Sequence, residues 1–319
     1  MKDIERKDLQ LLSKNSDMSE KTLNHSLREF VYPTEDKWSR FIQILLLTLG
    51  IGLMATGIVF FFAYNWDQLD KFIKLGLVQG LVVITIALTL ILKIEPLYKN
   101  ILLSGGAILV GVMFAVFGQV YQTGANAYDF FLVWTLFICL WVFISDFPPL
   151  WIFFLGLINL TIYLYWIQVA RNWDFIYLSA GLFVLNGSVL LISAWLATQK
   201  QKKIPDYFTN LIAITTAVWS VLSNVNWIMR PNYSFTEIAP IIAASILFYA
   251  IGIRYGTQQK SVFYLGLIPF CLIIICSAAL LRLNEGMEML LIVTLFIITS
   301  VSAVIFNLIK IQRKNSYEK

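Results

Sequence analysis

The sequence FIQILLLTLGIGLMATGIVFFFA occupies residues 41–63 and contains no charged side chain. An α-helix rises about 1.5 Å per residue, so a run of this length crosses a hydrocarbon core about 30 Å thick. The run begins about forty residues into the chain, is too long for the core of a signal peptide, and has no small-residue cleavage site after it. It predicts a membrane anchor that the mature protein keeps.

Apolar runs of the same kind continue almost to the C-terminus. Hydrophobic residues make up 59% of the chain and charged residues 13%, whereas about a quarter of the residues of a soluble domain are charged. The sequence therefore predicts an all-α fold, a polytopic transmembrane helix bundle of about ten spans. The nine spans expected after the first lie at residues 72–92, 101–120, 130–144, 150–168, 175–197, 208–225, 238–253, 262–281 and 289–309.

Lysine and arginine residues are distributed unequally between the two sides that ten spans would create. Counted over residues 21–314, the side that includes both termini carries fourteen of them. The other side carries five, which are Lys71, Lys74, Arg171, Arg230 and Arg282. Because cytoplasmic loops are enriched in basic residues, both termini are expected in the cytoplasm. The net charge of +5 comes from these helix ends and does not indicate a nucleic-acid partner.

Residues 1–38 precede the bundle and are expected to form a short cytoplasmic helical segment. Apolar residues at helical spacing predict two amphipathic pieces, with Leu9, Leu11 and Leu12 in the first and Leu23, Leu27 and Phe30 in the second. Asp17 and Glu20 are expected to form a capping box for the second piece, and Pro33 to end it. The bundle is expected over residues 39–309, and a basic tail over residues 310–319.

The tripeptide Asn-Trp-Asp occurs at residues 65–67 and again at residues 172–174. Each copy follows a span, the first and the fifth. The spacing favours a parallel four-helix repeat, with units at residues 39–145 and 150–253. Independent selection of interfacial tryptophans flanked by capping residues is the alternative interpretation.

Ionisable side chains are missing from the middle of every expected span, which argues against a proton relay. Uncharged polar residues do occur there, notably Gln79, Asn159 and Asn186. They either line a pathway or form hydrogen bonds between helices. The three cysteines, Cys139, Cys271 and Cys276, all lie in apolar runs, so the sequence predicts no disulfide framework and no metal site. No catalytic residue and no cofactor is predicted.

Polar and aromatic residues gather on the side opposite the termini, in AYNWD at residues 63–67 and GQVYQTGANAYD at residues 118–129. Carboxylates, amides, a hydroxyl and aromatic rings are the groups that bind a polar solute. The same residue types also cap helices, and Asp129 in particular is placed to cap the fourth span. Trp134 in the following span is added to these motifs. The candidate ligand-binding residues are Asn65, Trp66, Asp67, Gln119, Tyr121, Gln122, Thr123, Asn126, Asp129 and Trp134.

These two motifs, with Trp134 in the following span, resemble a bacterial multi-pass membrane protein family known as domain of unknown function 2157. The resemblance covers about residues 5–145. It implies a bacterial inner-membrane protein, and it implies no reaction, substrate or catalytic residue. The family pattern has an acidic residue at the position of Asn126, so this chain lacks that carboxylate.

Three functions are compatible with the sequence. The first is binding or transport of a small polar solute or lipid headgroup from the outer face. The second is a scaffold or assembly factor with a protein partner that docks on residues 1–32. The third is an enzyme acting on lipid-linked substrates, which we rank last because the outer loops are short and their arginines are scattered. The lipid bilayer is an expected partner in all three.

Overall fold

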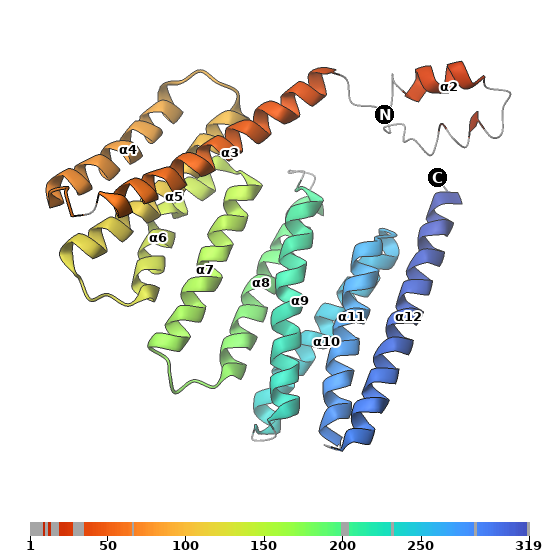
Figure 1. Ribbon diagram of the computed structural model, residues 1–319. Helices are drawn as coiled ribbons and strands as arrows, with labels where there is room; N and C mark the ends of the chain where they lie inside the picture. The colour runs from red at the N-terminus through yellow and green to blue at the C-terminus, as the bar shows by residue number, and fades with distance from the viewer. Residues whose placement is uncertain are drawn as a thin grey trace. The chain divides into compact units, whose positions relative to one another are not determined.

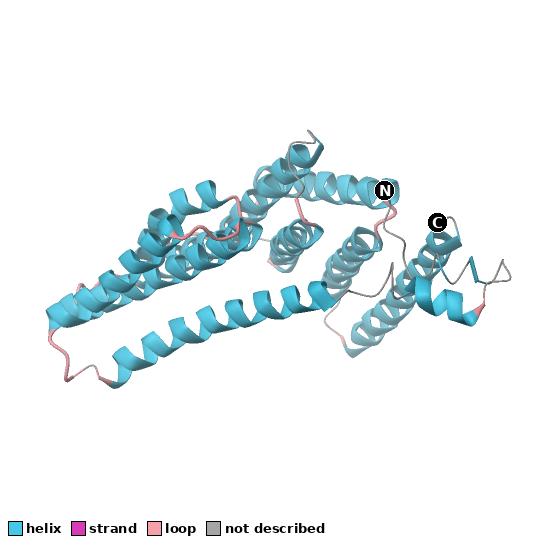
Figure 2. Ribbon diagram, turned by 90° about the horizontal axis from the view of Figure 1, so that it is seen from above, coloured by secondary structure: helices cyan, strands magenta, loops and turns pink. Residues whose placement is uncertain are grey.

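The computed structural model of the chain describes residues 9, 12–13, 19–27, 35–65, 67–198, 204–230, 233–283 and 286–317. The described residues form helices and no strands (Figures 1 and 2). The helices are α2 (Glu20–Ser26), α3 (Glu35–Tyr64), α4 (Lys71–Ile91), α5 (Pro96–Tyr121), α6 (Ala127–Ser145), α7 (Pro148–Gln168), α8 (Phe175–Thr198), α9 (Asp206–Met229), α10 (Phe235–Gln258), α11 (Val262–Leu283) and α12 (Met287–Tyr317).

Ten of these helices, α3 to α12, are long and apolar enough to cross a membrane. The all-α polytopic fold is therefore confirmed. The fourth and eighth expected spans, residues 130–144 and 238–253, were too short, because α6 and α10 each begin with a polar first turn. Capping boxes start both helices, with Asn126 bonded to Asp129 and Ser234 to Glu237.

The N-terminal segment is described in part. Within it, α2 begins after Ser19, whose Oγ accepts a hydrogen bond of 3.3 Å from the Thr22 backbone N–H. Leu9 and Leu27 are buried, whereas Leu12 is exposed. The predicted capping residue Asp17, the end at Pro33 and the apolar residues Leu11 and Phe30 lie outside the described residues.

The chain divides into two compact units. Unit 1 comprises Met1–Ala125, Phe137–Ser145 and Lys319, and unit 2 comprises Asn126–Leu136 and Asp146–Glu318. This division does not test the predicted four-helix repeat over residues 39–145 and 150–253, which stays a prediction.

In unit 1, α5 packs against both α3 and α4. Its core at one end of the helices is apolar, with Phe62, Leu75, Val78 and Val116 buried together. Close approach of α5 to α3 requires glycine at position 105, because an added Cβ there would lie 2.7 Å from a methyl carbon of Ile51.

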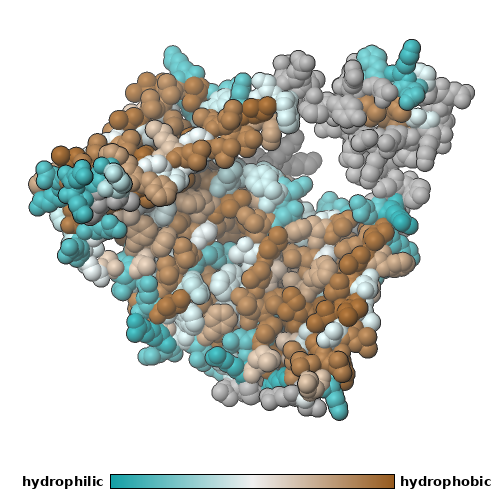
Figure 3. All heavy atoms as spheres, viewed as in Figure 1, coloured by the Kyte–Doolittle hydropathy of each residue, from teal (hydrophilic) through white to brown (hydrophobic). Residues whose placement is uncertain are grey.

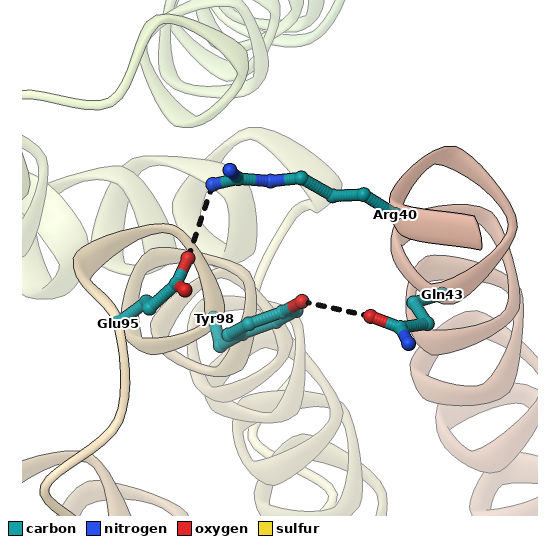
Figure 4. Close-up of polar contacts among 4 residues, drawn as sticks. All are labelled: Arg40, Gln43, Glu95 and Tyr98. Carbon is teal, nitrogen blue, oxygen red and sulfur yellow. Dashed lines mark hydrogen bonds and ion pairs between the residues drawn. The ribbon is translucent and has the colours of Figure 1, made fainter. Parts of the chain in front are cut away.

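At the opposite end of unit 1, polar side chains link the start of α3 to the start of α5 (Figure 4). Arg40 forms an exposed ion pair with Glu95 at 3.0 Å, and the Tyr98 hydroxyl donates a hydrogen bond of 3.4 Å to Gln43. Exposed pairs of this kind contribute little to stability, so the apolar core holds the three helices together.

In unit 2, α9 is the central helix, since it packs against α7, α8, α10 and α11. The α8–α9 pairing is the most extensive, and these helices lie side by side in Figure 1. Gly252 of α10 lets Ile268 of α11 approach closely, because a side chain there would collide with that of Ile268.

Large apolar side chains cover much of the surface of both units, and polar ones concentrate near helix ends (Figure 3). Leu53 and Phe60 of α3 and Leu291 of α12, for example, are largely exposed. Since an aqueous surface does not tolerate apolar patches of this extent, the environment of these helices is a lipid bilayer.

Candidate functional site

The two polar motifs predicted as a site come together in part within unit 1. Phe62 at the end of α3, Leu69 in the α3–α4 connection and Val120 at the end of α5 belong to one apolar cluster. This cluster holds the connection that contains Asn65 and Asp67 beside the end of α5. The remaining residues of the predicted site, from Asn126 onward, belong to unit 2.

Three of the predicted site residues serve as helix caps. The Asn65 side chain donates a hydrogen bond of 2.9 Å to the Phe61 carbonyl at the end of α3. The Asp129 carboxylate accepts one of 3.0 Å from the Asn126 backbone N–H, within the capping box of α6. The capping role weighed for Asp129 is therefore the one observed.

The other predicted residues differ in environment. Trp134 packs within unit 2 against three rings, those of Phe130, Phe131 and Phe153. Trp66 lies outside the described residues. The side chains in the rest of the predicted set are exposed, and these are Asp67, Gln119, Tyr121, Gln122 and Thr123.

Unit 2 has a polar and aromatic end of its own, where α6, α8 and α10 begin and α7 and α9 end. Gln168 of α7 accepts a hydrogen bond of 3.0 Å from the Tyr128 backbone N–H of α6. The Tyr165 ring contacts both Tyr128 and Trp173, which is the tryptophan of the second Asn-Trp-Asp copy. Tyrosine and tryptophan at a helix end are typical of the headgroup layer.

Two further hydrogen bonds at this end join helices. Tyr177 of α8 donates to Glu237 of α10 at 2.8 Å, and Tyr233 donates to Asn226 of α9 at 3.2 Å. Partial burial, followed by the negative charge of Asp174, raises the pKa of Tyr233 above its ordinary value. The phenol of Tyr233 therefore remains a hydrogen-bond donor at neutral pH.

Beneath this end, α9 and α10 share a buried network of uncharged groups. The Asn224 amide donates to Ser245 Oγ and to the Ser220 carbonyl, both at 2.8 Å. Ser220 Oγ donates to Ser245 Oγ at 3.2 Å and lies 2.9 Å from the Tyr249 hydroxyl. The Trp227 indole N–H reaches Asn224 Oδ1 at 3.3 Å, so the network extends toward the end of α9.

One member of this region has no hydrogen-bond partner. Ser223 Oγ is fully buried and unpaired among the described residues. Its neighbours Ser220 and Asn224, in contrast, each make several hydrogen bonds. A buried hydroxyl without a partner costs about 1–3 kcal/mol, which makes Ser223 an exception that calls for an explanation.

A second polar contact lies between α7 and α8. Asn159 and Asn186 donate to each other, at 3.2 Å and 2.7 Å. Of the two interpretations given for these residues, hydrogen bonding between helices is the one observed. Gln79, the third such residue, is exposed on α4.

Burial of polar groups distinguishes unit 2 from unit 1. Among the described residues, twelve polar or charged side chains are buried, and eleven of them belong to unit 2. The exception is Lys74 of unit 1. The eleven are Thr135, Thr161, Ser179, Asn186, Ser193, Thr216, Ser220, Ser223, Asn224, Ser245 and Ser277.

Sequence reasoning missed the α9 network, although a signal was present. Polar residues recur along α9 at positions 216, 220, 223 and 227, the spacing of one helical face. The expected span ended at residue 225, one residue after Asn224. In the structure α9 continues to Met229, which places Asn224 well inside the helix.

Comparison with known proteins bears on unit 1 above all. Residues 18–151 match the family described as "Predicted membrane protein (DUF2157)". The predicted resemblance is thereby confirmed for a part of the chain that contains both polar motifs. The match ends within the first turn of α7, so nearly all of unit 2, including the α9 network, lies outside it. No curated protein and no solved structure matches the chain.

Proposed function

We propose that this membrane protein binds a small polar solute inside unit 2 and passes it across the bilayer. The observation that carries the proposal is the buried network of Ser220, Asn224, Ser245 and Tyr249, which provides hydrogen-bonding groups inside a helix bundle surrounded by lipid. Polar groups at depth in a membrane protein commonly line a substrate path.

The route to this network supports the same function. Asn226 and Tyr233 lie at the end of α9, and Trp227 connects that end to Asn224. Hydrogen-bonding groups therefore follow one another from the headgroup layer into the bundle. A solute that leaves water exchanges its hydrogen bonds more easily along such a series than across an apolar core.

We further propose that the membrane is a bacterial inner membrane and that both termini are cytoplasmic. The unequal distribution of basic residues supports this orientation. With the termini inside, the end of unit 2 that contains Tyr177 and Glu237 faces outward, and the solute enters there.

The exposed residues of unit 1 have a secondary role in this proposal. Asp67 and Gln122 follow the ends of α3 and α5, which pack together. Their carboxylate and amide are suited to contact a lipid headgroup or an arriving solute.

The test is uptake of radiolabelled probes into proteoliposomes that contain the purified full chain. The probes are erythritol, urea, glutamate, choline and phosphate. We expect saturable uptake of at least one probe above that of protein-free vesicles. Replacing Asn224 by leucine should reduce this uptake about tenfold, since three hydrogen bonds are lost.

The variant Asp67→Ala/Gln122→Ala serves as the matched comparison in unit 1. Uptake lost in this double variant and kept in Asn224→Leu would move the site to unit 1. If no probe enters faster than in protein-free vesicles, the transport proposal is wrong.

A scaffold is the second candidate, and the surface of α3 favours it. Gly50 and Gly57 lie two turns apart on one face of α3, and an added Cβ at either would meet nothing within 4 Å, so this face is open to a helix of another protein. Absence of uptake, together with a second protein chain retained in native mass spectrometry, would support the scaffold.

A further inference from the structure

The unpaired hydroxyl of Ser223 allows the solute to be described more closely. We propose that Ser223 and Asn224, with the hydroxyls of Ser220 and Ser245, form a binding site for a small uncharged molecule that carries hydroxyl or amide groups. The inference rests on the proposed transport function and specifies its substrate class.

Ser223 lies on α9 at the edge of the network. It lies one helical turn beyond Ser220 and directly before Asn224, so it borders the network without joining it. It also shares a face with Thr216, two turns earlier, whose methyl group lies 3.6 Å from a Cβ built at Gly187 of α8. Ser223 therefore belongs to the side of α9 that faces α8, beside the contact with α10.

The hydrogen bonds of the network have defined directions. Ser220 and Asn224 both donate to Ser245 Oγ, so Ser245 is an acceptor in the two bonds that it makes. Since the Ser220 proton points to Ser245, the Tyr249 hydroxyl donates to Ser220. The hydroxyl protons of Ser245 and Ser223 thus both remain for an acceptor that a bound molecule would bring.

The surroundings of the network favour an uncharged solute. Among the described residues, the buried polar side chains of α8, α9 and α10 are serines, one threonine, asparagines and the Tyr249 phenol, and none is an aspartate, glutamate, histidine, lysine or arginine. A charged solute would lose its hydration at this depth without a counter-charge, which is costly. An uncharged solute replaces its bonds to water with bonds to hydroxyl and amide groups.

Ser223 is close to the end of its helix. Ser223 lies six residues before the end of α9 at Met229, a distance of about 9 Å along the helix. That end carries Asn226 and Tyr233, which are joined by a hydrogen bond. A small molecule that displaces this bond reaches Ser223 after less than two helical turns.

The experiment uses the same proteoliposomes, with erythritol and urea as uncharged probes and glutamate, choline and phosphate as charged ones. We expect erythritol or urea to enter with saturation, and Ser223→Ala to raise the half-saturating concentration about tenfold. The thermal unfolding midpoint of Ser223→Ala should equal or exceed that of the wild type, because the variant removes an unpaired buried hydroxyl.

Ser179→Ala is the matched control. Ser179 is also fully buried in unit 2, but its hydroxyl donates to the Ile176 carbonyl of its own helix. The control should leave the half-saturating concentration unchanged.

The possible failures are distinguishable. Saturable uptake of an uncharged probe that Ser223→Ala leaves unchanged would overturn the site while the transport function stands. Uptake of charged probes alone would overturn the substrate class in the same way. Lack of uptake of every probe by the wild-type protein would overturn both the transport function and this inference.

Discussion

The two units of this protein bury different kinds of side chain. Unit 1 closes around Phe62, Leu75, Val78 and Val116, and the contacts of Arg40 with Glu95 and of Tyr98 with Gln43 link its helices near their ends. Unit 2 buries eleven of the twelve buried polar or charged side chains among the described residues. Both units present apolar side chains outward, so they differ inside and not at the lipid surface.

The difference shows where chemistry can reside in a bundle of membrane helices. Lipid is as apolar as leucine, so helices gain little by burying leucine alone, and hydroxyl or amide groups give them specific contacts. In unit 2 these contacts join α7 to α8 and α9 to α10. The family match covers mainly unit 1, and therefore describes the apolar unit better than the polar one.

The largest expected effect comes from placing an amide in the core of unit 1. Val78 is fully buried among apolar side chains, so Val78→Asn should lower the free energy of unfolding by about 1–3 kcal/mol through the unpaired amide, with any loss of packing added. This free energy is measured by unfolding the purified protein with sodium dodecyl sulfate in mixed micelles and following the loss of helix by circular dichroism.

Val78→Thr is the control for this substitution. A threonine hydroxyl can donate to the carbonyl four residues earlier in its own helix, as Thr85 does to Leu81 at 2.8 Å. It should therefore cost less than the asparagine. Equal losses in the two variants would mean that the core of unit 1 accepts an amide, and the contrast between the units would no longer hold.

The architecture followed from the sequence because long uncharged runs have few alternatives in a membrane. All ten spans were predicted at the correct places, and only their ends were displaced. The displacement came from residues such as Asn126 and Ser234, which open a helix yet resemble a loop. Hydropathy measures only how apolar a residue is. It does not distinguish a polar residue that caps a helix from a polar residue in a loop.

The site was harder to predict. The outer motifs drew attention because their polar residues are consecutive, but consecutive residues at a helix end include caps such as Asn65 and Asp129. The α9 network involves residues that are individually only mildly polar. Ser220 and Ser245 form part of a network only when two helices place them 3.2 Å apart, and one sequence does not state which helices pack together.

An intermediate effect is expected from the asparagine pair of unit 2. Asn186→Leu removes both hydrogen bonds to Asn159, while Asn159 keeps its bond to the Leu155 carbonyl. Hydrogen bonds between membrane helices contribute about 0.6 kcal/mol on average, so a loss near 1 kcal/mol is expected for the reciprocal pair.

The double variant Asn159→Leu/Asn186→Leu completes a cycle for this pair. Its loss should be smaller than the sum of the two single losses, because the second replacement removes an amide that the first left without its partner. Strict additivity would show that the two amides do not interact in the bilayer.

The smallest effect is expected at Thr216, and it tests which buried polar groups matter. Thr216 is fully buried, but its hydroxyl donates at 2.8 Å to the Ile212 carbonyl of its own helix. Thr216→Val keeps the shape of the side chain. The Ile212 carbonyl loses the bond from the hydroxyl, but it still accepts the backbone hydrogen bond of the α9 helix. The free energy of unfolding should therefore change by less than about 0.5 kcal/mol.

A loss at Thr216 as large as that at Asn186 would mean that polarity itself stabilises unit 2, wherever the hydroxyl points. A small loss would instead assign the stabilisation to groups that bridge helices, such as Asn186 and Asn224. In that case the stability of unit 2 depends on which buried polar groups form hydrogen bonds between helices, and not on how many polar groups are buried. Ser223, which bonds neither to its own helix nor to a neighbouring one, is then the group left for a ligand.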